Sequence, residues 1–304
     1  MEIGTAFIWT IVAMGIIAYA VTARRRRHEV VASQDFPREW ERILEKNVRH
    51  YSLLPPDLAE ELKRHILIFL DEKTFEGCGG LEVTEEMKVT VAALACFLLL
   101  NRDTSHYKGV GTILLYPEAY KVKEARDGPT IKSDDQGRLG ESWDHGSVVL
   151  SWNSVKNSAS NIKSGQNLVM HEFAHQLDQE NGPSDGVPVF EDDDQYSSWA
   201  EVLAPEFERL KDKAEKGKGT VMDHYGATNP AEFFAVATET FFEKAEKLRD
   251  KRPELYEELK AYYKVDPAEW HSRLRQEQNP EAAESEAEAE ESKFVMPAHS
   301  PFAS

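Results

Sequence analysis

An H-E-x-x-H run, His171 to His175, lies inside an apolar stretch and constrains the fold of this chain more than any other feature. On an α-helix, residues four positions apart lie on the same face, so the two imidazoles can bind one metal ion. Neutral imidazole nitrogens suit zinc, which lowers the pKa of a bound water to about 7. Glu172, one step round the helix, can act as the base that takes a proton from that water. The run therefore predicts a buried helix that carries the metal site of a zinc hydrolase.

The third metal ligand has to come from another part of the chain. Where metzincin-type zinc peptidases continue the motif with glycine and a third histidine, this chain has Asp178 and Asn181, which excludes that class. The segment 229–235 is the best source, because Asn-Pro is typical of a helix start and a carboxylate in an apolar helix is costly without a partner. Glu232 and Glu239 lie two turns apart on nearly the same face, so spacing alone leaves both as candidates.

Further polar residues leave alternatives open. Whichever of Glu232 and Glu239 does not bind the metal can instead fix the tautomer of a ligating histidine, and Asp178 is another candidate for that role. His145 and His224 are rival ligands, but each lies in a polar, loop-like stretch, where a solvated histidine is the more common case.

Five strings of the sequence carry a family resemblance: Phe75–Thr84, Gly140–Trp143, Val148–Trp152, His171–Asp178 and Ala231–Ala235. Over about Asp35 to Trp270, the chain resembles the Mlc titration factor A family of zinc peptidases. That family is similar in its catalytic core to the lethal-factor metallopeptidase domain. The resemblance implies a zincin-like fold and one zinc ion per chain.

Residue by residue, the resemblance makes His171, His175 and Glu232 the metal ligands and Glu172 the base, and it favours Glu232 over Glu239. It also implies that Tyr225 stands near the metal, where a phenol can donate a hydrogen bond to the oxyanion of a tetrahedral intermediate. Without the resemblance, the sequence favours an ordinary tyrosine in a turn at position 225. Relatives act as peptidases, including on short amino-terminal substrates, and are linked to a sugar-responsive transcriptional repressor.

The amino-terminal end differs sharply from the middle of the chain. Residues 3–22 carry no charge, and about 20 helical residues reach about 30 Å, the hydrocarbon thickness of a bilayer. Residues 1–23 are therefore predicted to be a transmembrane anchor, followed by a basic juxtamembrane linker over 24–34. Because Arg24 to Arg27 follow the apolar segment, the catalytic domain is expected on the cytoplasmic side of the inner membrane. A signal peptide has the opposite polarity.

Residues 35–272 are predicted to form one α+β domain, mainly helical, with a small mixed sheet. Helix-length patterns cover 37–48, 56–72, 85–100, 196–216, 230–247 and 253–263, and strands are expected at 111–116, 119–123 and 147–152. The last strand could present an edge to an extended peptide, although packing inside the sheet fits its apolar content equally well.

The carboxyl-terminal residues 273–304 are predicted to be an acidic, disordered tail, because 276–292 is rich in Glu and Ala and lacks large apolar residues. A helix over 281–291 is the alternative, but its glutamates repel one another. The net charge of −18 argues against direct nucleic-acid binding. Two cysteines, Cys78 and Cys96, are too few for a disulfide framework and fit a reducing compartment.

Three functions follow as hypotheses. The first is a membrane-anchored zinc peptidase that cleaves a peptide or protein substrate. The second is a protein that sequesters a transcriptional regulator, with zinc only structural; Glu172 argues against it, because zinc retention needs no base. A zinc hydrolase that acts on a small amide is the third.

Overall fold

Helices make up most of the computed structural model, which describes residues 2–118, 141–143 and 146–270. The α-helices of this described part are α1 (Glu2–Ala32), α2 (Arg38–Asn47), α3 (Pro56–Glu72), α4 (Glu85–Cys96), α5 (Trp152–Ser160), α6 (Leu168–Asp178), α7 (Asp193–Glu215), α8 (Pro230–Glu243), α9 (Ala245–Lys251) and α10 (Pro253–Tyr263). Short 3-10 helices are η1 (Arg49–Leu53), η2 (Phe97–Leu99), η3 (Gln179–Asn181) and η4 (His224–Ala227). The strands are β1 (Thr74–Gly77), β2 (Thr112–Tyr116), β3 (Glu141–Trp143) and β4 (Ser147–Ser151).

The strands form one mixed sheet in the order β1-β2-β4-β3, in which β3 alone runs antiparallel to its neighbour. The strands predicted at 111–116 and 147–152 are present as β2 and β4, whereas the one predicted at 119–123 lies outside the described residues. The interpretation of the 147–152 strand as an exposed edge is wrong, because β4 lies between β2 and β3. Its side chains from Val148 to Ser151 are buried, as is typical of an interior strand.

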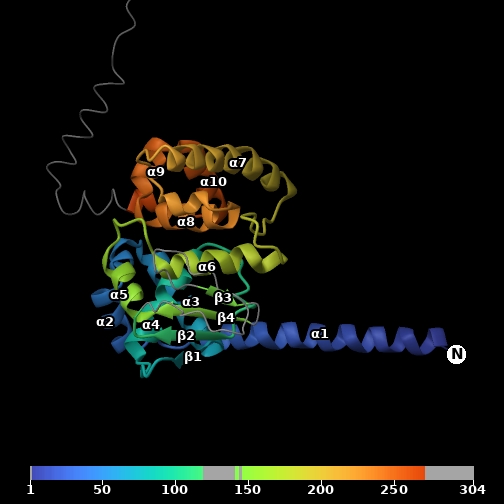
Figure 1. Ribbon diagram of the computed structural model, residues 1–304. Helices are drawn as coiled ribbons and strands as arrows, with labels where there is room; N and C mark the ends of the chain where they lie inside the picture. Colours follow the sequence, from blue (N-terminus) through green and yellow to red (C-terminus); the bar gives the residue numbers. More distant parts are fainter. Residues whose placement is uncertain (1, 119–140, 144–145, 271–304) are drawn as a thin grey trace, which may run out of the picture.

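Apart from α1, which extends away from the rest of the molecule, the α-helices lie in two groups with α6 between them (Figure 1). The sheet and α2 to α5 form the amino-terminal group, while α7 to α10 form the carboxyl-terminal group. α6 packs against α4 and α5 of the first group and against α8 of the second. One continuous core of buried apolar side chains joins the groups, and Cys96, free and fully buried, belongs to it. A helix that is buried on both sides is a rigid platform for polar side chains.

The transmembrane anchor predicted over residues 1–23 is wrong, and so are the fold class that includes it and the single-pass inner-membrane localisation. Among the described residues, no helix is both long and apolar enough to cross a bilayer.

Residues 24–32, predicted as part of a linker, continue α1 without a break and attach it to α3. Arg24 makes two hydrogen bonds to the Glu72 carboxylate, at 2.8 and 3.0 Å, and His28 lies 2.6 Å from the same carboxylate. Arg27 pairs with Asp71 at 2.7 Å. The basic end of α1 is therefore fixed to the acidic end of α3.

Candidate metal centre

The H-E-x-x-H run lies on α6, and the residues around it explain why a helix begins there. The Asn167 side chain accepts a hydrogen bond from the backbone N–H of Met170 (3.1 Å), which caps the first turn. The apolar residues of the run are buried in the core. Helical spacing then brings the His171 and His175 rings together, with 4.9 Å between their centroids.

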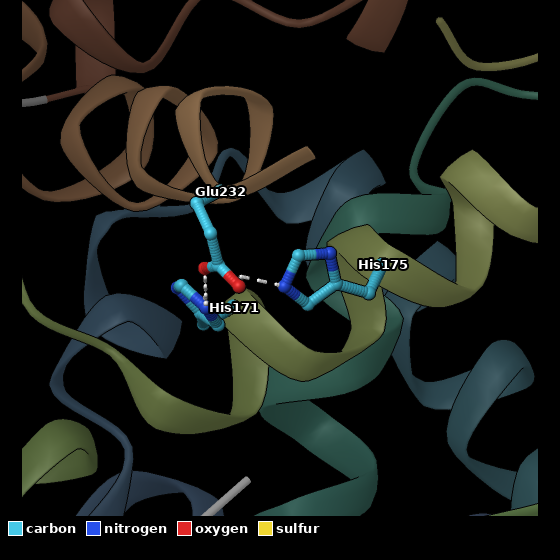
Figure 2. A group of neighbouring side chains, drawn as sticks. All are labelled: His171, His175 and Glu232. Atoms are coloured by element: carbon cyan, nitrogen blue, oxygen red, sulfur yellow. Dashed lines mark hydrogen bonds and ion pairs between the residues drawn. The ribbon is translucent and has the colours of Figure 1, made fainter. Parts of the chain in front are cut away.

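Glu232 reaches the two histidines from the first turn of α8. Asn229 caps this helix by accepting a hydrogen bond from the Glu232 backbone N–H (2.9 Å). The Glu232 Oε2 atom lies 3.0 Å from Nε2 of His171 and 3.5 Å from Nε2 of His175 (Figure 2). One ligand atom from each residue lies within 4.8 Å of the others. In the described part of the chain, no other group of His, Cys, Asp and Glu converges in this way.

The charges around His171 fit a cation at this point. Its Nδ1 lies 2.7 Å from a Glu239 carboxylate oxygen, so each ring nitrogen faces a carboxylate. Burial acts to lower the pKa of His171, but the hydrogen bonds to Glu232 and Glu239 raise it to about 10. The carboxylates therefore favour a positive charge between His171 and Glu232, at the position where a metal cation would lie. Two imidazole nitrogens and one carboxylate oxygen form a ligand set that zinc binds, with a position left open.

Three carboxylates form a row on one face of α8, because Glu239 and Glu243 follow Glu232 at seven and eleven positions. Besides His171, Glu239 accepts a hydrogen bond from the backbone N–H of Asn167. Glu243 accepts hydrogen bonds from the Gly165 N–H (2.7 Å) and the Asn167 side chain (3.1 Å), and burial raises its pKa to about 7. This row holds the start of α6 against α8.

The helical spacing left both Glu232 and Glu239 as candidate metal ligands, and the structure places them differently. Glu232 faces both histidines, whereas Glu239 lies on the far side of His171. Glu243 was missed at the sequence level. The sequence feature that could have identified it is its position four residues after Glu239 in an otherwise apolar helix.

Two further candidates lie beside the group of ligands. Glu172 follows His171 on α6. Its side chain is buried, and burial raises the pKa of its carboxyl group. Tyr225 lies in η4, with its ring centroid 6.0 Å from that of His171. Both are therefore brought to the same region of the molecule as the predicted ligands.

The remaining candidates do not join this group. Asp178 accepts hydrogen bonds from the Gly186 N–H (3.0 Å) and the Ser184 hydroxyl (3.2 Å), so it holds the loop after α6. His224 is exposed and lies 2.9 Å from the Lys218 carbonyl oxygen. His145 lies outside the described residues.

Comparison with known proteins gives the family of this chain. Residues 21–264 match the model of the family described as glucose-regulated metallo-peptidase M90. The uncharacterized protein slr2042 of Synechocystis is 38% identical over 269 residues, which are 86% of this chain and 98% of the relative. Mlc titration factor A of Serratia proteamaculans is 33% identical, over 75% of this chain and 89% of the relative. Its counterpart in Yersinia pestis is 32% identical, over 77% and 90%. On these matches, the chain belongs to the glucose-regulated metallopeptidase M90 family.

Proposed function

We propose that this chain is a zinc-dependent peptidase in which His171, His175 and Glu232 hold the metal and Glu172 is the general base. The observation that carries the proposal is the convergence of the two Nε2 atoms on one Glu232 oxygen, between two buried helices. Membership of a metallopeptidase family supports the reaction class. Zinc is proposed as the metal because the ligand set is one that zinc prefers.

When bound, the metal supplies a Lewis acid that polarises the scissile carbonyl and lowers the pKa of a water. Glu172 takes a proton from the attacking water and gives it to the leaving amine; its raised pKa favours the first transfer, because a weaker acid has a stronger conjugate base. Tyr225 donates a hydrogen bond to the developing oxyanion. Glu239 holds the His171 ring with its proton on Nδ1, which leaves the Nε2 lone pair for the metal.

A peptide-library cleavage assay tests this proposal. The wild-type chain, loaded with zinc, is expected to cleave library peptides, and Glu172→Gln is expected to lower the rate by about 10²-fold or more, because it removes the general base. Metal content is measured on both proteins, so that lost metal is not mistaken for lost catalysis. Absence of cleavage by the zinc-loaded wild type would reject the peptidase assignment, and turnover of small amides alone would favour the third hypothesis.

Binding of a transcriptional regulator is the second candidate function, and the name of the relatives at 32–33% identity, Mlc titration factor A, favours it. Such binding would use the outer surface and would not need the base. Glu172→Gln should therefore keep full affinity for an Mlc-type repressor in a titration while it loses hydrolysis. If the wild type binds the repressor but cleaves no peptide, the binding function stands and the peptidase proposal fails.

A further inference from the structure

A basic pocket lies beyond the carboxyl-terminal end of α8. It is a cavity of about 540 Å³ whose walls come from α7, the loop at 219–221, and α9 with its flanking residues. Its cationic lining side chains are Arg209, Lys213, Lys244, Lys247, Lys251 and Arg252. Among the residues that the structure describes, no acidic side chain lines this cavity.

The pocket is separate from the candidate metal centre. Glu232 lies in the first turn of α8, whereas Lys244 follows the last residue of that helix. Twelve residues at about 1.5 Å per residue place the two about 18 Å apart along the helix axis. None of the proposed metal ligands lines the pocket.

The cations of the pocket gather around one cavity in a chain whose 54 acidic residues outnumber its 36 basic ones. Several lysines elsewhere pair with a carboxylate; for example, Lys63 pairs with Glu41 at 2.6 Å and Lys264 with Glu191 at 2.7 Å. In contrast, the four pocket lysines make no ion pair within the part of the chain that the structure describes. Unpaired like charges around one cavity repel one another, so a bound anion would relieve the repulsion.

The two arginines of the pocket are held in place by a single carboxylate. Glu206 pairs through Oε2 with Nε of Arg209 (2.9 Å) and through Oε1 with Nη1 of Arg252 (3.1 Å). Each guanidinium has five N–H donors, so both keep donors for a ligand after these bonds are made. Arg209, Lys213, Lys244 and Arg252 are half-buried, which limits their freedom before a ligand arrives.

We propose that this pocket binds a small polyanion that carries two or more phosphate or carboxylate groups. A cavity of this size lies within the range of about 300–1,000 Å³ typical of small-molecule sites. Arginine and lysine are the residues that bind phosphate and carboxylate oxygens through charge-assisted hydrogen bonds. A single monoanion would neutralise only one of the four unpaired lysines, so the number of cations points to a multiply charged ligand.

The anionic groups have two possible sources: a free polyphosphorylated compound, or the chain itself. Seven glutamates lie between positions 277 and 291. Trp270, the last described residue, lies with its ring centroid 6.4 Å from that of Phe242, two positions before Lys244. The described part of the chain therefore ends near the carboxyl-terminal end of α8, and the experiment has to distinguish the two sources.

Calorimetric titration of the full chain with inorganic tripolyphosphate, at about 0.15 M salt, tests the proposal. We expect saturable binding that the double variant Lys247→Gln/Lys251→Gln weakens by roughly tenfold or more, because two charge-assisted contacts are lost. Both lysines are exposed, so the fold is preserved. The matched control is Lys46→Gln/Lys88→Gln, which has the same net charge but changes lysines paired with Glu86 and Glu85. Equal weakening in the control would overturn the proposal, because it would show a general charge effect.

A third variant of the full chain separates the sources by changing the seven glutamates to glutamine: Glu277, Glu281, Glu284, Glu286, Glu288, Glu290 and Glu291. Tighter tripolyphosphate binding by this variant would identify the chain's own glutamates as the occupant. Unchanged affinity would identify a free polyanion. If neither the wild type nor this variant binds tripolyphosphate, the pocket is not a polyanion site.

Discussion

Tyr225 lies beside His171, with 6.0 Å between the ring centroids, and we propose that its hydroxyl acts on the oxyanion. An interaction of that kind is made in the transition state, so Tyr225→Phe should lower kcat by about 10²- to 10³-fold. KM should change much less, because the bound substrate does not use the bond. Steady-state kinetics on a cleaved library peptide, with the metal content of both proteins, checks this. An unchanged kcat at full metal content would reduce Tyr225 to a packing residue.

Glu239 acts on the metal only through His171, whose Nδ1 lies 2.7 Å from its carboxylate. Glu239→Ala should raise the Kd for zinc by about 10- to 100-fold, the range seen when such a carboxylate is removed. Glu239→Gln should fall between this variant and the wild type, because an amide still accepts one hydrogen bond but carries no charge. Competition with a chelating dye gives the affinities.

The matched control for Glu239 is Glu243→Gln, one turn further on the same face of α8. Glu243 holds the backbone at Gly165 and the side chain of Asn167 but does not contact the His171 ring. The control should therefore change the free energy of unfolding more than the Kd for zinc. Equal losses of zinc affinity in both variants would show that Glu239 merely supports the fold.

The junction of α1 and α3 makes stability depend on acid pH through Glu72. Burial acts to raise the pKa of Glu72, but the hydrogen bonds from Arg24 and His28 outweigh it and lower the pKa to about 2. A folded-state pKa below the unfolded value of about 4.3 stabilises the fold above that value, and the contribution is lost as the pH falls toward 2. Glu72→Gln should therefore cost on the order of 2 kcal/mol near pH 7.

Urea unfolding of wild type and Glu72→Gln at pH 7, 5, 4 and 3 checks this prediction. The difference in unfolding free energy between the two proteins should be constant from pH 7 to 5 and should shrink below about pH 4.3, as the wild-type carboxylate gains the proton. A difference that stays constant to pH 3 would show that the ion pairs of Glu72 do not fix α1 to α3.

Helices with clear caps could be predicted from the sequence, while elements fixed by packing could not. Asn167 and Asn229 mark the starts of α6 and α8 in the sequence, and both cap those helices in the structure. The helix predicted over 230–247 instead breaks at Lys244, whose φ of −125° and ψ of 36° lie outside the helical region. The short strands β1 and β3 were not predicted, because three or four residues carry too little periodicity.

The same limit applies to the choice between Glu232 and Glu239. Helical spacing placed both on one face of α8, but the distance from each carboxylate to the histidines depends on how α8 packs against α6. The family resemblance favoured Glu232, and the structure brings Glu232 together with His171 and His175. The apolar composition of residues 3–22 led to the wrong prediction of a membrane anchor for a related reason. Composition alone does not show that the arginines after this segment form ion pairs with α3.

At the scale of the whole molecule, the candidate site joins the two helix groups, since α6 supplies both histidines and α8 supplies the carboxylates (Figure 1). Metal binding should therefore hold the two helix groups together. Substitution of a metal ligand should also have a different effect from substitution of the general base. A ligand variant loses the metal, whereas a base variant keeps the metal and loses only the reaction.

The most direct test is the metal-to-protein ratio of Glu172→Gln and Glu232→Gln, measured side by side by elemental analysis after dialysis against the same zinc buffer. The account predicts about one zinc per chain for Glu172→Gln, as in the wild type, and a ratio well below that for Glu232→Gln. Retention of a full zinc equivalent by Glu232→Gln, or its loss from Glu172→Gln, would contradict the assignment of ligand and base.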